Sequence, residues 1–212
     1  MKKLPFWADH VGSLLRTDDV KINRIKWKKG EISAEELRVI EDRGIAETVK
    51  KLESIGMKSI TDGEFRRDYF HLDFLKELAG VTVTGGIEAN PNAKVAEDGF
   101  TPPKLSVTGK LQHVKDIQVA DFNYLKSVTT QTPKVSIPSP TMVHFRGGRA
   151  SIDINSYPDM DNFFHDLAKA YRREIDHLYQ NWLRYLQLDD TNQATDLIEG
   201  VEATCIDNGM PI

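Results

Sequence analysis

The sequence predicts an α/β fold in which parallel strands form the core and helices pack outside them. Short runs rich in apolar and β-branched residues alternate with longer segments of helical periodicity. Such alternation is typical of parallel sheets, because each crossover between parallel strands needs a helix or a long connection. The length of 212 residues is enough for one large domain with a buried core, so we expect a single domain over residues 1–212.

The composition narrows the class of protein. Hydrophobic residues make up 40% of the chain and charged residues 28%, which is ordinary for a soluble globular protein. The net charge of −4 gives no reason to expect nucleic-acid binding. The start, "MKKLPFWADH", lacks the apolar core of a signal peptide, and no run approaches the ~20 apolar residues of a membrane span. Cys205 is the only cysteine, so we expect a cytoplasmic protein without disulfides or a membrane partner.

The first part of the chain predicts a strand and then a long helix. Residues 4–15, "LPFWADHVGSLL", mix aromatic and apolar residues and predict a strand that runs into a Gly-Ser turn. Residues 32–56 predict a helix that begins at a capping box of Ser33 and Glu36. Gly56 follows its last turn and is a natural stop.

Residues 81–112 break this pattern. "VTVTGGIEA" and "PKLSVTGKL" alternate and are rich in β-branched residues, with turn residues between them, so an inserted β-hairpin is predicted near 81–112. The other predicted elements are a solvated basic segment at 21–31, strands at 57–61, 134–140 and 185–190, and helices at 70–78, 119–129 and 161–182. The last helix is predicted to bury Phe164, Leu167, Ala168, Tyr171, Ile175, Leu178 and Trp182.

Polar residues gather where three of the predicted strands end. Active sites of α/β folds lie beyond the carboxyl ends of the strands, so these side chains can project into a common mouth. Gly63, between two carboxylates, lets the backbone turn sharply there. The alternative is that the carboxylates cap helices or pair with Arg66 and Arg67, but repetition at several strand ends favours a site. The residues concerned are Gly12, Ser13, Asp62, Gly63, Glu64, Asp189 and Asp190.

Four motifs carry a family resemblance. "DHVGSLLR", "ITDGEFRRD", "SIPSP" and "RYLQLDDT" resemble, in order and in spacing, the short single-barrel relatives of cobalamin-independent methionine synthase. The resemblance implies a TIM-type (β/α)8 barrel like that of uroporphyrinogen decarboxylase. It also implies methyl transfer, without cobalamin, from a methylated folate-type donor to the thiol of homocysteine, and a zinc ion that binds this thiol as thiolate.

The resemblance also implies roles for individual residues. Val11, Gly12 and Ser13 match the motif that holds the carboxylate of homocysteine or methionine, and Glu64 and Asp189 match the carboxylates that bind its ammonium group. Hydroxyl and turn N–H donors suit a carboxylate, and acidic acceptors suit an amine. In the longer enzymes Glu-Pro follows the aspartate, whereas Asp190 and Thr191 follow it here. The residues expected to support the site are His10, Asp62, Arg66 and Asp190. No residue is assigned a catalytic role.

The family's zinc ligands have no match in this chain. They are a His-x-Cys pair, a later glutamate and a further cysteine, and this sequence has no His-x-Cys. We therefore expect no metal ligands here, a partly buried thiol at Cys205, and only the N-terminal part of a barrel, since a full one needs ~250 residues. Without zinc, activation of the thiol has no evident source.

Two alternative functions stay open. One is a non-catalytic remnant that binds an amino-acid-like ligand, which the missing zinc half favours. The other is a magnesium-dependent lyase or aldolase barrel with Asp62, Glu64, Asp189 and Asp190 as hard oxygen ligands. A half-closed barrel would leave strand edges and apolar faces uncovered, so we expect the chain either to form an oligomer, for example a homodimer, or to be poorly stable. His113, His165 and His177 are expected to be structural or solvated.

Overall fold

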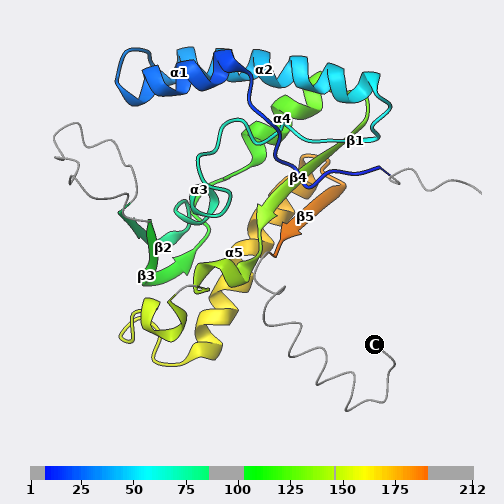
Figure 1. Ribbon diagram of the computed structural model, residues 1–212. Helices are drawn as coiled ribbons and strands as arrows, with labels where there is room; N and C mark the ends of the chain where they lie inside the picture. Colours follow the sequence, from blue (N-terminus) through cyan, green and yellow to red (C-terminus); the bar gives the residue numbers. More distant parts are fainter. Residues whose placement is uncertain (1–7, 86–102, 146, 191–212) are drawn as a thin grey trace, which may run out of the picture.

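The computed structural model describes residues 8–85, 103–145 and 147–190 (Figure 1). Its helices are α1 (Asp18–Lys28), α2 (Ala34–Ser54), α3 (Leu72–Leu75), α4 (Val119–Val128) and α5 (Met160–Gln180), with 3-10 turns η1 (Pro140–Val143) and η2 (Gly148–Ser151). Its strands are β1 (Ser59–Ile60), β2 (Ala79–Thr84), β3 (Lys104–Gln112), β4 (Thr132–Pro138) and β5 (Tyr185–Asp189). The predicted α/β class is confirmed, and among these residues no helix is long and apolar enough to cross a membrane.

A parallel sheet forms the centre of the molecule. β4 is its middle strand and pairs in parallel with β1 on one side and β5 on the other. Successive side chains of a strand point to opposite faces, and Val135 and Ile137 of β4 join the main hydrophobic core with α5. Lys134, Ser136 and Pro138 alternate with them and therefore lie on the other face, which carries polar groups.

The hairpin forms a separate two-stranded sheet. β2 and β3 pair antiparallel, which confirms the predicted insertion, while its connection at 86–102 is outside the described residues. Val107 and Leu111 of β3 are buried in the main core, and the Leu111 amide donates to the Tyr157 hydroxyl over 2.7 Å. β3 thus packs against α5 and attaches the hairpin to the rest of the molecule (Figure 1).

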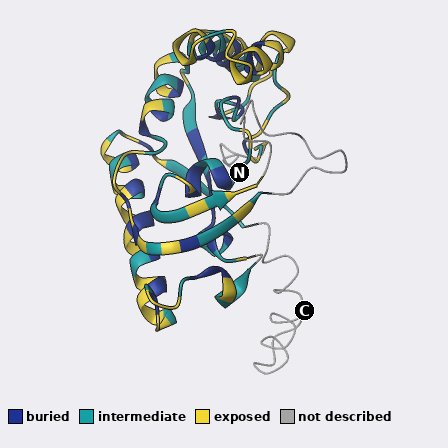
Figure 2. Ribbon diagram, turned by 90° about the vertical axis from the view of Figure 1, so that its left-hand side faces the viewer, coloured by how far each residue is buried: buried dark blue, intermediate teal, exposed yellow. Residues whose placement is uncertain are grey.

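The predicted buried face of α5 is partly wrong. Phe164, Ala168 and Trp182 are exposed, and Figure 2 shows how exposed and buried residues alternate around the helices. A charged residue, Glu174, is fully buried because hydrogen bonds from distant parts of the chain satisfy its carboxylate, so hydrophobicity alone misplaces the stripe. The buried residues are Phe163, Leu167, Ala170, Tyr171, Glu174 and Leu178.

α1 and α2 pack together above β1. α2 begins with the predicted capping box of Ser33 and Glu36, and Gly56 beyond its end has a φ of +88°. The basic segment is helical as α1, but Arg24 is buried and pairs with Glu41 and Asp68, so a wholly solvated face is wrong there. A second core joins α1, α2 and α4 around Val20, Ile45, Val49, Ile60, Phe65 and Leu125.

The predicted first strand is wrong over residues 8–16, which form no strand; residues 4–7 and Cys205 are outside the described residues. The segment is held in another way, because side chains of the sheet take the place of a ladder partner and donate to its carbonyls. Three bonds of 2.6 Å do this: Lys134 Nζ to His10, Ser136 Oγ to Val11, and Thr61 Oγ1 to Gly12.

Candidate active site

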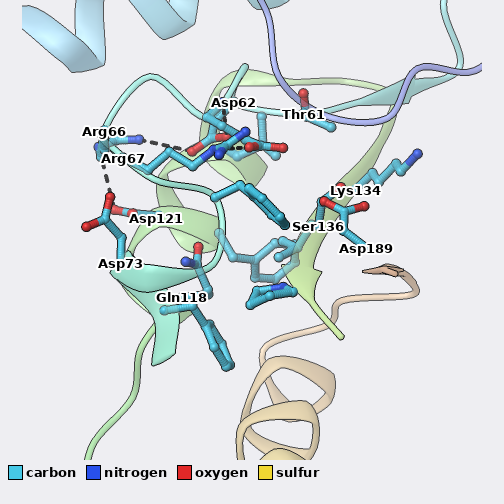
Figure 3. Close-up of a pocket in the computed structure, with 17 residues that line it drawn as sticks. Thr61, Asp62, Arg66, Arg67, Asp73, Gln118, Asp121, Lys134, Ser136 and Asp189 are labelled. Atoms are coloured by element: carbon cyan, nitrogen blue, oxygen red, sulfur yellow. Dashed lines mark hydrogen bonds and ion pairs between the residues drawn. The ribbon is translucent and has the colours of Figure 1, made fainter. Parts of the chain in front are cut away.

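A cleft lies between β4, the loop after β1, and helices α3 and α4 (Figure 3). Its volume is about 650 Å³, open solvent included. Apolar rings from α3 and α4 form part of its wall, as expected for a small-molecule site. Charged and polar side chains of the lining include Asp62, Glu64, Arg66, Arg67, Ser136 and Asp189.

The loop after β1 turns through two consecutive left-handed residues. Gly63 has a φ of +68° and Glu64 a φ of +55°. A Cβ at position 63 would lie 2.7 Å from the Phe65 ring, so glycine is required there by space as well as by φ. Glu64 adopts a conformation that costs about 1–2 kcal/mol for an L-residue. The strain is held by hydrogen bonds from Glu64 N to Asp62 Oδ1 (2.8 Å) and from Gly63 N to Thr61 Oγ1 (3.1 Å).

This turn delivers the Glu64 carboxylate into a nearly closed position, with its side chain 11% exposed. Oε2 forms an ion pair with Arg67, and Oε1 is buried without a hydrogen-bond partner among the described residues. A Cβ on Gly12 would clash with Oε1 and lie 2.8 Å from Ser136 Oγ, so Gly12 packs directly on this group. Burial raises the pKa of Glu64, and the charge of Asp189 adds to the rise against the opposing charge of Arg67.

Arg66 anchors the same loop. It forms ion pairs with Asp42, with Asp62 (3.5 Å) and with Asp121 (3.5 Å), and its guanidinium lies over the Tyr124 ring at 5.2 Å. Burial raises the pKa of Asp62, and the Arg66 charge opposes that rise. Because Arg66 is surrounded by carboxylates from α2 and α4, it can position the loop but has little charge left for a ligand.

The end of β5 supplies a second acidic group. Asp189 lines the cleft, and Figure 3 shows it beside Ser136 and Lys134 of the neighbouring strand. Its Oδ1 accepts a hydrogen bond of 2.5 Å from Gln187 Nε2, and its backbone carbonyl accepts one of 2.9 Å from Ser139 N. Asp190 is not among the residues that line the cleft, and its Oδ1 accepts from Thr141 Oγ1 at 3.4 Å.

The structure separates the residues of the first predicted motif. Gly12 is buried against Glu64, whereas Val11 and Ser13 are exposed and do not line the cleft. His10 is half-buried, and burial lowers its pKa. The structure therefore brings Gly12, Glu64, Asp62 and Asp189 together, whereas Ser13 is exposed and is not among the residues that line the cleft.

The sequence did not predict several polar residues of the cleft, and two of them come from β4. Lys134 and Ser136 line the cleft from β4. The sequence does contain a signal for them. In "KVSIP" the polar Lys134 and Ser136 alternate with the apolar Val135 and Ile137, which is the pattern of a strand with one polar face.

The cleft does not fit a zinc ion. Histidine nitrogen and cysteine sulfur are the usual donors of protein zinc sites. The described residues that line the cleft include neither histidine nor cysteine. The zinc chemistry implied by the resemblance therefore has no ligand set in this cleft.

Comparison with known proteins agrees with this architecture. The family model "Cobalamin-independent synthase, Catalytic domain" matches residues 6–206. YxjH of Bacillus subtilis (strain 168), an uncharacterized protein, is 43% identical over 195 residues, which are 90% of this chain and 49% of YxjH. The crystal structure of a proposed vitamin-B12-independent methionine synthase from Listeria monocytogenes matches with a TM-score of 0.74 and 40% identity, over 90% of this chain and 54% of that one.

A more distant relative has a named activity. The 5-methyltetrahydropteroyltriglutamate–homocysteine methyltransferase of Saccharomyces cerevisiae is 27% identical over 91% of this chain and 24% of its own length. The chain spans about half the length of the first curated relatives it matches. The structural likeness confirms the predicted partial (β/α)8-type barrel. Since the family model covers nearly all of it, the chain belongs to the family of the cobalamin-independent synthase catalytic domain.

Proposed function

We propose that this chain carries the amino-acid-binding part of a site that transfers a methyl group from a methylated folate-type donor to the thiol of homocysteine. The observation that carries the proposal is the convergence of Glu64 and Asp189 on one cleft, with the Gly12 backbone packed against Glu64. Membership of the family, and the activity named for the yeast relative, support the choice of reaction.

The charges around the cleft favour an ammonium group. Arg66 is compensated by three carboxylates, and Lys134 is paired with Asp9 at 2.9 Å. Arg67 faces Glu64 through one oxygen only, which leaves Oε1 as an acceptor, and Asp189 lies close enough to affect the titration of Glu64. Two neighbouring carboxylates with one compensating arginine suit a substrate's positive charge.

The backbone beside Glu64 can receive the other end of an amino acid. The carbonyls of Val11 and Gly12 already accept hydrogen bonds from side chains of the sheet. Among the described residues, the amides of Val11, Gly12 and Ser13 donate to no other group of the chain. Unused N–H donors in a turn form a suitable cradle for a carboxylate, and the Ser13 hydroxyl can add a further donor.

The reaction itself makes one bond and breaks one. The S–CH₃ bond to homocysteine forms while the N–CH₃ bond of the donor breaks, the thiol loses a proton, and the donor nitrogen gains one. The residues described here bind and orient the amino-acid end. No step for the thiol is assigned to the cleft, because its described lining includes neither histidine nor cysteine, the usual donors of protein zinc sites.

That missing ligand set also favours a second candidate function. A chain that binds homocysteine or methionine without transferring a methyl group would need only the ammonium and carboxylate subsites. A magnesium-dependent lyase is less well supported, because Arg66 and Arg67 compensate Asp62 and Glu64, the carboxylates such an ion would need.

Calorimetry with homocysteine and methionine tests the binding proposal. Charge-assisted hydrogen bonds contribute about 1.5–3 kcal/mol each, so Glu64→Gln and Asp189→Asn should each weaken affinity roughly ten- to a hundredfold. Glu47→Gln is the matched control, since Glu47 is exposed on α2. Equal affinities for wild type and Glu64→Gln would remove Glu64 from the site. A methyl-transfer assay with a methylated folate then separates the two candidates, since only the transferase forms methionine.

A further inference from the structure

We propose that His113, Asp116 and His177 form a binding site for a divalent transition metal, with Zn²⁺ as the best match. His113 and Asp116 lie in the connection between β3 and α4, and His177 lies in the last turn of α5. Each offers one donor atom, and these atoms all lie within 4.8 Å of one another. None of the three lines the candidate active site, so the proposal is independent of the function proposed above.

His113 is already oriented as a metal ligand would be. It is buried, as a structural histidine would be, and its Nε2 lies 2.6 Å from Glu174 Oε2. An ionised carboxylate can only accept, so this contact suits the tautomer with the proton on Nε2 and leaves Nδ1 as the nitrogen available to a metal. Metal-binding histidines commonly donate their second nitrogen to a carboxylate in this way, which fixes tautomer and ring.

Glu174 is itself held in place. Its side chain is 0% exposed, and its oxygens accept from the amides of Ile117 (3.1 Å) and Gln118 (2.7 Å) as well as from His113. These amides belong to the segment that leads into α4. The carboxylate therefore cannot swing away from the histidine, and the position of His113 is determined before any ion arrives.

The other two side chains can adjust to an ion. His177 Nδ1 and Asp116 Oδ1 are 2.5 Å apart, their side chains are 41% and 50% exposed, and the two histidine rings meet edge to face at 5.2 Å. Zinc–ligand distances of 2.0–2.2 Å place tetrahedral donors about 3.3–3.5 Å apart. Exposed side chains can make the small movement required, and water can complete the coordination.

The chemistry of the donors selects the metal. Two imidazoles and one carboxylate suit zinc and its transition-metal neighbours, whereas Mg²⁺ and Ca²⁺ prefer oxygen ligands. The ion would join the connection between β3 and α4 to the end of α5. Because these segments lie far apart in the sequence, binding should stabilise the folded chain.

The test uses the 212-residue chain without a histidine tag, stripped with a chelator and titrated with Zn²⁺ and Co²⁺. We expect one ion per chain, a Co²⁺ visible spectrum typical of nitrogen and oxygen ligands, and a Tm raised by roughly 5–10 °C at a hundredfold excess over the Kd. His177→Ala and Asp116→Ala should each weaken binding at least tenfold. Both residues are partly exposed, so these variants should fold.

His165→Ala is the control, because His165 is an exposed histidine of the same helix and should bind the ion as wild type does. Glu174→Gln removes the carboxylate behind His113 and should lower affinity ten- to a hundredfold with the three ligands intact. Absence of binding to the wild-type chain would overturn the proposal. So would equal binding by wild type, His177→Ala and Asp116→Ala, which would place the ion elsewhere.

Discussion

Carboxylates at the two ends of the parallel sheet have opposite environments and opposite shifts in pKa. At the amino ends of the strands, Asp9 accepts hydrogen bonds from Ser59, Tyr185 and the buried Lys134. Although burial alone would raise the pKa of Asp9, these donors hold it well below its usual range. The acid there is charged, paired and satisfied, and it serves the stability of the fold.

The carboxyl ends hold the opposite case. Burial raises the pKa of both Asp62 and Glu64, and Glu64 sits in a strained left-handed conformation with one oxygen lacking a partner in the described chain. Burial of an acidic side chain therefore does not by itself show which way its pKa is shifted or whether it is structural. What distinguishes the structural acid Asp9 from Glu64, the proposed ligand-binding acid, is whether every carboxylate oxygen already has a donor.

The largest expected loss of stability comes from removing a partner of Asp9 at the amino ends of the strands. Lys134→Met leaves Asp9 without its cation, and loss of one partner of a buried pair costs about 3 kcal/mol or more. Urea unfolding should show this loss relative to wild type. Lys50→Met, an exposed lysine of α2, should change the unfolding free energy by less than about 0.5 kcal/mol. Equal effects of the two variants would mean that the Asp9 cluster does not stabilise the sheet.

A smaller loss of stability is expected from a substitution in the left-handed turn at Gly63 and Glu64. Gly63→Ala should lower the unfolding free energy by about 1–2 kcal/mol through its positive φ, with a further cost from the contact with Phe65. Gly56→Ala is the matched control, because Gly56 also has a positive φ but open space around its Cα. The difference between the two variants isolates the packing of the turn. If both lose the same stability, the contact of Gly63 with the Phe65 ring is not tight.

The smallest expected effect is the pH dependence of stability, which has opposite signs for Asp9 and for Glu64. The pKa of Asp9 is lowered by folding, so its contribution to stability is present above the unfolded pKa and is lost only as pH falls through the folded value. The pKa of Glu64 is raised, so the folded chain gains stability as pH falls through that raised value. Unfolding of wild type, Asp9→Asn and Glu64→Gln at several pH values measures both contributions.

Ligand binding adds an independent readout to this pH series. Affinity for the ammonium group of an amino acid should weaken as pH falls through the raised pKa of Glu64. A wild-type chain that instead loses stability relative to Glu64→Gln as Glu64 becomes protonated would contradict the opposite signs.

Sequence reasoning succeeded where the cause of a structure is local. The capping box at Ser33 and the alternation of the hairpin strands act within a few residues, so β2, β3 and α2 were predictable. Asp62, Glu64 and Asp189 were placed from the predicted strand ends and line the cleft, whereas Asp190, placed in the same way, does not.

It failed where the partners lie far apart in the chain. Glu174 is buried because His113 and two amides, more than 50 residues away, satisfy it. Arg24 is buried for a similar reason, through Glu41 and Asp68. No periodicity of α5 or α1 contains that information, since it depends on which segments meet in three dimensions.

The segment of residues 8–16 is held in place by contacts that do not depend on its own side chains. Its main chain is held by side chains of other elements, Thr61, Lys134 and Ser136, through carbonyl oxygens that every amino acid possesses. Its own side chains at Val11 and Leu15 point into solvent. The contacts that place this segment therefore come from the loop after β1 and from β4, so substitution of Val11 or Leu15 should leave its backbone beside Glu64.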